Sequence, residues 1–167
     1  RKGRDITHRF PEVKVDPSVV LVGELVVLQS GYSQFHMMQK RSVDNPKDIA
    51  IRSKIFPATL VAFDVLEVKG QDFRKDPLSA RRKLLENLEK AGLTNEHVFV
   101  AGYWGCPKEK VEEYLQLMRD QEAEGIVVKN LDAPYEEKRG DAWHKQNHVR
   151  GAVLQEQQRG QEAGHRL

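Results

Sequence analysis

The clearest sign of the fold is a run of ten residues, Val19-Val20-Leu21-Val22-Gly23-Glu24-Leu25-Val26-Val27-Leu28. The run is apolar at both odd and even positions and rich in β-branched residues, which is typical of a buried strand. One acid, Glu24, interrupts it. Because an unpaired buried carboxylate is costly, Glu24 is expected to meet a cation, a metal ion or several hydrogen-bond donors.

A second run of the same kind, from Ala58 to Val68, predicts another strand with an acid, Asp64, inside it. Between the two strands, residues 35–40 are expected to form a short helix, and Asn45-Pro46 predicts a turn. The first half of the chain therefore predicts two long strands with a short helix and a turn between them.

Two amphipathic helices are expected further along the chain. Asp76-Pro77 predicts an N-cap and a first-turn proline for a helix that ends near Gly92, and Pro107 opens the second helix. The apolar positions are Leu78, Leu84, Leu85 and Leu88 in the first helix, and Val111, Tyr114, Leu115 and Met118 in the second. Their spacing is that of one buried helix face.

Short strands are also predicted at residues 97–100 and 124–129, and a last one after Trp143. The order is strand-rich, then alternating, then strand-rich, which indicates an α+β domain with mainly antiparallel sheets rather than a doubly wound fold. Residues 1–147 are expected to form one partial domain. Residues 148–167 contain four Gln and three Gly without an apolar period and predict a disordered or non-homologous tail.

Composition excludes several classes of protein. The 167 residues are 39% hydrophobic and 31% charged, with a net charge of +2, which suits one domain and excludes a strongly disordered chain or a histone-like DNA binder. No apolar run approaches the roughly 18 residues of a membrane span. Cys106 is the single cysteine, so no internal disulfide can form, and a reducing, cytoplasmic compartment is expected.

Charged residues next to the strands suggest a chemistry. Glu24 and Glu124 lie in or beside apolar strands, and Lys129, Arg139 and Lys145 are cations near such strands. Carboxylates can hold Mg²⁺ and cations can neutralise phosphate oxygens, which suits metal-assisted phosphate chemistry. Spacing alone equally allows two structural ion pairs at strand ends.

Five segments in order resemble motifs of ATP-dependent DNA ligases, closest to the archaeal type. They are Arg1-Lys2-Gly3-Arg4-Asp5-Ile6-Thr7-His8-Arg9-Phe10-Pro11-Glu12, Val22-Gly23-Glu24, Phe63-Asp64-Val65-Leu66, Glu124-Gly125-Ile126-Val127-Val128-Lys129, and Arg139 with Trp143-His144-Lys145. The resemblance implies a partial nucleotidyltransferase (ATP-grasp-like) adenylation domain. It also implies an enzyme that uses ATP and Mg²⁺ to seal nicked double-stranded DNA in repair, replication and recombination, through a lysyl-adenylate and a DNA-adenylate.

The resemblance assigns roles residue by residue. Arg1, Glu24, Phe63, Lys129, Arg139 and Lys145 would bind the nucleotide, with Phe63 stacking on adenine and the cations neutralising phosphates. Glu24 and Glu124 would bind the metal. The implied protein is a monomer without membrane contact, located in the cytoplasm with the nucleoid, or in the nucleus of a eukaryote.

Three differences from the family pattern shape the expected activity. The nucleophilic Lys-x-Asp-Gly motif does not occur in the sequence, Val22 stands at the family's Asp position, and Asn147 stands at its last Lys. The chain alone is therefore expected to be an inactive fragment. Two alternatives remain: a degenerate nucleotide- or DNA-binding remnant without activity, and an RNA ligase or capping-type nucleotidyltransferase. The Phe-Pro-Glu segment favours DNA ligase over the latter.

Overall fold

The computed structural model describes residues 3–29, 32–33, 35–92, 95–103, 105–120, 125–137 and 143–147. The chain divides into two compact units. The first unit is Arg1–Tyr103 together with Leu131–Glu137, and the second is Trp104–Asn130 with Lys138–Leu167. Within the described residues, no helix has both the length and the apolar character needed to cross a membrane.

The first unit is built on a mainly antiparallel sheet. Its elements are η1 (Thr7–Arg9), β1 (Val19–Gln29), β2 (Tyr32–Ser33), α1 (Phe35–Arg41), α2 (Pro46–Ile55), β3 (Ala58–Val68), β4 (Gln71–Asp72), α3 (Leu78–Lys90) and β5 (Val98–Val100). The strand order is β2-β1-β3-β4, and β5 also pairs with β3. Only the β3–β5 pairing is parallel. The expected α+β class with mainly antiparallel sheets is confirmed.

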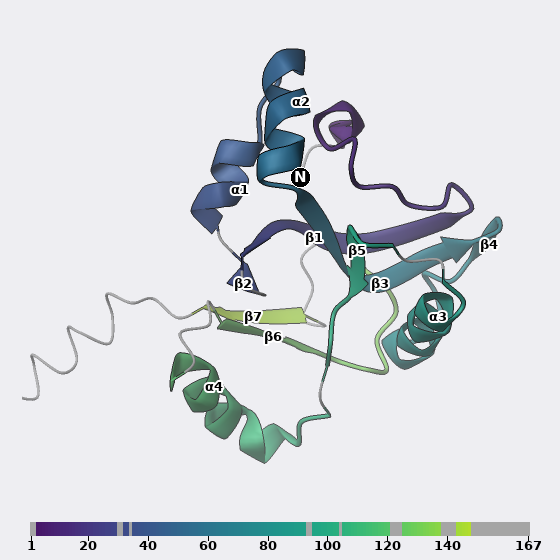
Figure 1. Ribbon diagram of the computed structural model, residues 1–167. Helices are drawn as coiled ribbons and strands as arrows, with labels where there is room; N and C mark the ends of the chain where they lie inside the picture. Colours follow the sequence, from purple (N-terminus) through teal and green to yellow (C-terminus); the bar gives the residue numbers. More distant parts are fainter. Residues whose placement is uncertain are drawn as a thin grey trace, which may run out of the picture. The chain divides into compact units, whose positions relative to one another are not determined.

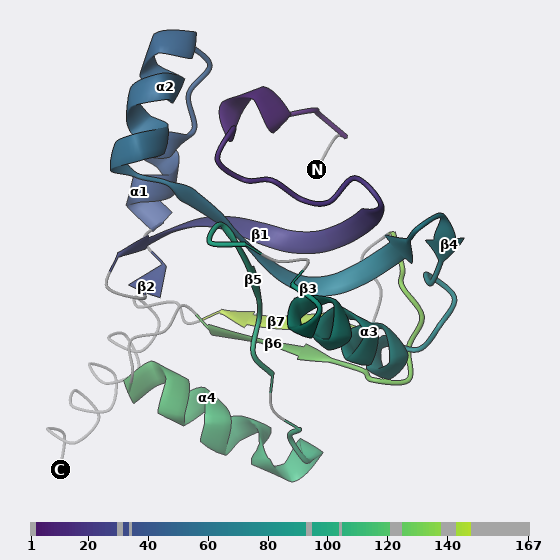
Figure 2. The ribbon, with the colours of Figure 1, turned by 45° about the vertical axis from the view of Figure 1, so that its right-hand side comes forward.

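The long pair β1–β3 organises this unit (Figure 1). In Figure 1 and Figure 2, α1 and α2 lie near the start of β3, and α3 lies toward its other end beside β4. The core under α3 joins Val19, Ala62 and Val65 of the strands to Leu85 and Leu88 of the helix. The apolar stripe predicted for this helix therefore packs on the sheet.

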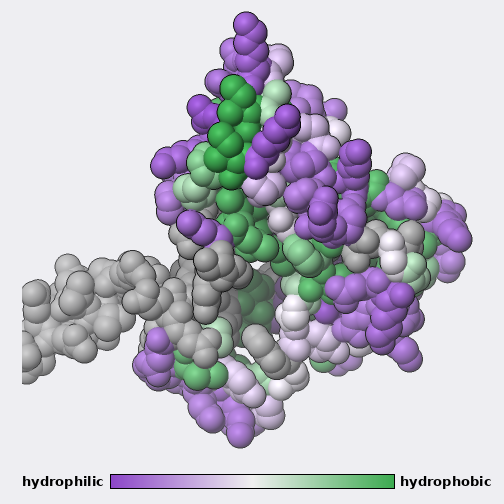
Figure 3. Space-filling model, viewed as in Figure 1, coloured by the Kyte–Doolittle hydropathy of each residue, from purple (hydrophilic) through white to green (hydrophobic). Residues whose placement is uncertain are grey.

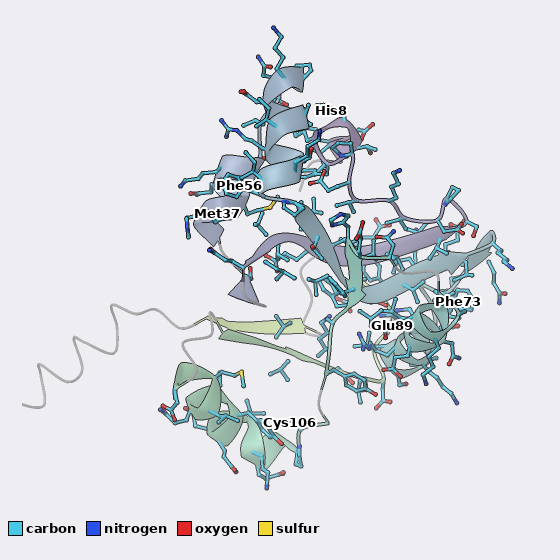
Figure 4. The ribbon with its side chains drawn as sticks, in the orientation of Figure 1. His8, Met37, Phe56, Phe73, Glu89 and Cys106 are labelled. Carbon is cyan, nitrogen blue, oxygen red and sulfur yellow. The ribbon has the colours of Figure 1, made fainter. Side chains whose placement is uncertain are left out.

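The second unit contains η2 (Lys108–Lys110), α4 (Val111–Asp120), β6 (Gly125–Lys129) and β7 (Trp143–Asn147). The two strands pair antiparallel, and α4 packs on β6. Leu115, one of the predicted apolar positions of α4, is buried. Cys106 is exposed and lies before η2 (Figure 4). The predicted helix and strands of this part are confirmed, whereas residues 148–167 lie outside the described residues.

The helix α2 differs from the prediction, because Asn45-Pro46 begins a helix of ten residues instead of forming a turn. Asn45 is its N-cap, with a side chain that accepts hydrogen bonds from the first turn, and Pro46 occupies the first helical position. Only Ile49 of the helix is buried, whereas Ile51 and Ile55 are exposed. Figure 3 shows a strip of hydrophobic surface along α2. Since the apolar residues do not share one buried face, they give no clear amphipathic period.

The N-terminus of α3 also differs from the prediction. Pro77, not Asp76, is the N-cap residue, and no side chain caps the helix. Instead the main-chain N–H groups of Leu78 and Ser79 donate to the carbonyl oxygens of Ala133 and Leu131, both at 2.9 Å. A helix leaves its first N–H groups unsatisfied, so a segment distant in sequence takes the place of the expected cap.

Candidate functional site

The pairing of β1 with β3 is interrupted at the position of two ligase-like motifs. Gly23 lies opposite Ala62 and Val22 lies opposite Asp64, so β3 has one extra residue, Phe63, between two consecutive positions of β1. This is a β-bulge. Bulges bend a strand and change the direction of a side chain, and they occur often next to functional sites.

Gly23 is required where the two strands come together. A Cβ atom at Gly23 would lie 2.7 Å from the main-chain oxygen of Val61, 2.7 Å from Cδ1 of Leu60 and 3.1 Å from Cα of Ala62. The first contact is with backbone, which cannot move aside as a flexible side chain can. The glycine between Val22 and Glu24 therefore permits the close strand contact next to the bulge.

Glu24 does not have the environment that its apolar neighbours predicted. The side chain is exposed, and β1 is buried only at Val19, Val26 and Val27, so the expectation of a strand buried on both faces is wrong. Gly23 pairs with the core residue Ala62, so alternation puts Glu24 on the opposite face of the sheet. Among the described residues nothing pairs with its carboxylate, which leaves both oxygens available to a hydroxyl group or a cation.

The structure brings Glu24 and Phe63 together on neighbouring strands. Glu24 lies opposite Val61, two residues before Phe63, and Phe63 is half-buried. Val22 shares the face of Glu24 by strand alternation and is also half-buried. The two residues predicted to touch adenine and ribose or metal thus belong to one short stretch of paired backbone.

The second unit brings two of the predicted cations onto one pair of strands. Lys129 lies opposite Trp143, and Lys145 lies opposite Val127. Lys129 is half-buried. The predicted residues Arg1, Glu124 and Arg139 lie outside the described residues. In the part of the chain that is described, no three His, Cys, Asp or Glu side chains form a metal-binding group.

The buried acid of the site is Asp64, to which the sequence interpretation assigned no role. Its carboxylate receives two hydrogen bonds from Arg81 of α3, from Nε to Oδ1 at 2.8 Å and from Nη2 to Oδ2 at 2.9 Å. Both side chains are fully buried. The signal was present in the sequence as an acid in an apolar strand, but nothing local identified the partner 17 residues away.

The Phe-Pro-Glu segment has a structural role in the first unit. Arg41 of α1 donates three hydrogen bonds to Glu12, at 2.8–3.0 Å, and lies over the ring of Phe10 with its Cζ 4.9 Å from the ring centre. Glu12 also accepts the main-chain N–H of Ala58 at 2.9 Å. These contacts anchor the N-terminal segment to α1 and to the start of β3.

Hydrogen bonds lower the pKa of two carboxylates in turns, the half-buried Asp16 and the exposed Asp72. The hydroxyl group and main-chain N–H of Ser18 hold the pKa of Asp16 below its ordinary value, just before β1. The main-chain N–H of Arg74 and its side chain lower the pKa of Asp72 in the same way. Both carboxylates stabilise turns at the ends of strands.

Most of the chain matches proteins of one family. The family model described as "ATP dependent DNA ligase domain" matches residues 1–146. A probable DNA ligase of Streptomyces coelicolor is 32% identical over 152 residues, covering 84% of this chain and 29% of that protein. A DNA ligase of Nanoarchaeum equitans is 30% identical over 147 residues, covering 81% of this chain and 25% of that protein.

Solved structures agree with this result. The ligase domain of LigD from M. tuberculosis has a TM-score of 0.59 and 30% sequence identity, covering 78% of this chain and 37% of that one. A mycobacterial DNA ligase D complexed with ATP and MES gives the same TM-score and identity, and is covered to 38%. The fold is thus that of a nucleotidyltransferase adenylation domain.

The chain therefore belongs to the family of ATP-dependent DNA ligases. It spans 29% of the length of the Streptomyces protein and 25% of the Nanoarchaeum protein. The resemblance drawn from the five sequence motifs is confirmed.

Proposed function

We propose that this chain forms part of the adenine-nucleotide site of an ATP-dependent DNA ligase that seals nicks in double-stranded DNA. The observation that carries the proposal is the position of Glu24 and Phe63 on paired strands at the β1–β3 bulge, where Glu24 lies opposite Val61, two residues before Phe63. One of these residues supplies an exposed carboxylate and the other a half-buried aromatic ring. Related structures include one complexed with ATP.

Each residue has a task that suits its chemistry. Phe63 stacks on the adenine base, and Glu24 accepts hydrogen bonds from the ribose hydroxyl groups or binds Mg²⁺. Lys129, Arg139 and Lys145 neutralise phosphate oxygens, Arg1 makes a further phosphate contact, and Glu124 is a second Mg²⁺ ligand. The exposed Glu24 carboxylate, with no partner among the described side chains, fits a hard cation that prefers oxygen ligands.

In the family's reaction a lysine attacks the α-phosphate of ATP and releases pyrophosphate. The adenylate then passes to the 5′-phosphate of the nick, and the 3′-hydroxyl group displaces AMP as the nick is sealed. In that sequence the residues of this chain bind and orient the nucleotide and offset phosphate charge. The family match supports DNA as the partner, and the Phe-Pro-Glu segment resembles DNA ligases rather than RNA ligases or capping enzymes.

A titration of the chain with AMP tests the proposal. Phe63→Leu keeps an apolar side chain in the strand but removes the aromatic face, so the affinity for AMP should fall about fivefold to 150-fold, the range that stacking energies imply. Glu24→Gln should also weaken binding. The control is Glu89→Gln on the exposed side of α3 (Figure 4), which should bind AMP as the unaltered chain does.

Two results would separate the alternatives. Unchanged affinity in Phe63→Leu and Glu24→Gln, with native circular dichroism, would show that this site does not bind the nucleotide. Absence of AMP binding by the unaltered chain would contradict the proposed nucleotide site and leave only a remnant that binds DNA; Val22 and Asn147 make a degenerate remnant the second candidate.

A further inference from the structure

The buried pair Asp64–Arg81 is adjacent to the bulge. Asp64 directly follows Phe63 in β3, and Arg81 lies in the first turn of α3. The two-point contact leaves no exposed surface on either side chain. Oδ1 of Asp64 also accepts the main-chain N–H of Val65 at 2.9 Å, so the carboxylate is held by its own strand as well as by Arg81.

Arg81 is itself fixed by other contacts. Its Nη1 donates to the carbonyl oxygens of Asp76 and of Ala133, the latter at 3.4 Å, and its Cζ lies 6.0 Å from the ring centre of Tyr135. The segment that carries Ala133 also caps α3 through Leu78. These contacts fix the position of the guanidinium group within the first unit. The carboxylate of Asp64 must lie beside that position to accept its two hydrogen bonds.

Stability alone does not explain such a pair. Replacing a buried ion pair by apolar side chains of similar volume is often neutral or stabilising, because desolvation offsets the attraction between the charges. The pair can instead favour one register of β3 over another. A slip of one residue in β3 would turn its side chains to the other face and would move Asp64 away from Arg81.

We propose that Arg81, acting through Asp64, is a positioning residue for Phe63. The pair selects the register in which Ala62 lies opposite Gly23, Asp64 lies opposite Val22, and Phe63 is the extra residue between them. Without the pair, β3 can move the bulge to another position, because Leu66 is already the extra residue of a second irregularity in the same strand. The link to adenine rests on the proposed function, whereas the register does not.

The first unit contains a matched control. Glu12–Arg41 is also a buried pair, with exposed side-chain fractions of 9% and 0%, and its acid also accepts a main-chain N–H of β3, that of Ala58. Ala58 is the first residue of β3 and lies before both irregularities of the strand. Removing this pair also deletes a buried ion pair next to β3, and it is expected to leave the bulge in place because Ala58 lies away from both irregularities.

The experiment compares two double variants, Asp64→Leu with Arg81→Met and Glu12→Leu with Arg41→Met. Cross-strand nuclear Overhauser effects in the ligand-free protein report the register of β1 and β3. The first variant should lose the Gly23–Ala62 and Val22–Asp64 pattern, and the second should keep it. The affinity for AMP should fall about tenfold or more in the first variant, as expected when stacking is lost, and should stay unchanged in the second.

The outcomes distinguish the two proposals. An unaltered register in the Asp64/Arg81 variant would overturn the positioning role, whatever happens to AMP binding. If the unaltered chain fails to bind AMP, the proposed function fails, and the register measurement still decides the inference. If the double variant does not fold, Arg81→Lys replaces it: this variant keeps the charge and loses the two-point contact. This variant should show cross-strand effects of the native register together with those of a shifted register, and the native pattern alone would contradict the proposal.

Discussion

Gly23→Ala should destabilise the first unit measurably. The new Cβ would lie 2.7 Å from the main-chain oxygen of Val61 and 2.7 Å from Cδ1 of Leu60, both closer than normal contact. Forcing an extra carbon into a packed site costs about 1–3 kcal/mol. Alanine also stabilises the folded state by about 0.4–1 kcal/mol, because it lowers the conformational entropy of the unfolded chain. The net loss in free energy of unfolding is therefore about 0–2.6 kcal/mol, with a central value of about 1.3 kcal/mol.

Urea denaturation followed by circular dichroism measures this difference. Gly102→Ala is the matched control, because a Cβ at Gly102 would meet nothing within 4 Å. The control should be neutral or slightly stabilising. Equal stability of the two variants would refute the argument that β1 and β3 approach too closely at Gly23 for a side chain.

Further predictions concern separate parts of the chain. Arg41→Met leaves the Glu12 carboxylate buried without its partner and should cost about 3–5 kcal/mol in urea denaturation; a loss below about 1 kcal/mol would show that water compensates Glu12. The Asp16 pKa is lowered in the folded chain, so this carboxylate stabilises the fold above its unfolded pKa, and the contribution disappears as pH falls through the folded value. Ser18→Ala should raise the Asp16 pKa toward the ordinary 3.8 in an NMR titration, and an unchanged pKa would contradict the assigned cause. Val22→Asp puts a second carboxylate on the face of Glu24 and should increase Mg²⁺ affinity in a calorimetric titration. An unchanged affinity would indicate that Glu24 does not bind the metal. The 167-residue chain with α-labelled ATP and Mg²⁺ should form no adenylate that survives denaturation, because it contains no Lys-x-Asp-Gly motif; retained label would reveal another nucleophile.

Local patterns in the sequence were sufficient for most of the secondary structure. The predicted strand from Ala58 to Val68 has those bounds in the structure, and the apolar stripes of α3 and α4 pack as expected. These features depend on periodicity, which is a property of each segment by itself. The helix α2 was missed because its apolar residues do not share a buried face.

Features that depend on two distant segments could not be predicted. The bulge at Phe63 exists only in the register between β1 and β3. The cap of α3 comes from Leu131 and Ala133, and the partner of Asp64 lies on another element. The motif resemblance assigned both Glu24 and Phe63 to nucleotide binding. It did not show that Glu24 is exposed, or that the buried acid is Asp64.

The most direct test of the account is the contact between adenine and Phe63. Nuclear Overhauser effects are measured between the protons of AMP and a chain labelled at phenylalanine. The account predicts contacts from adenine H2 or H8 to the Phe63 ring, with upfield shifts of the adenine protons, and their disappearance in Phe63→Leu. Binding of AMP with adenine contacts to other phenylalanines and none to Phe63 would contradict it.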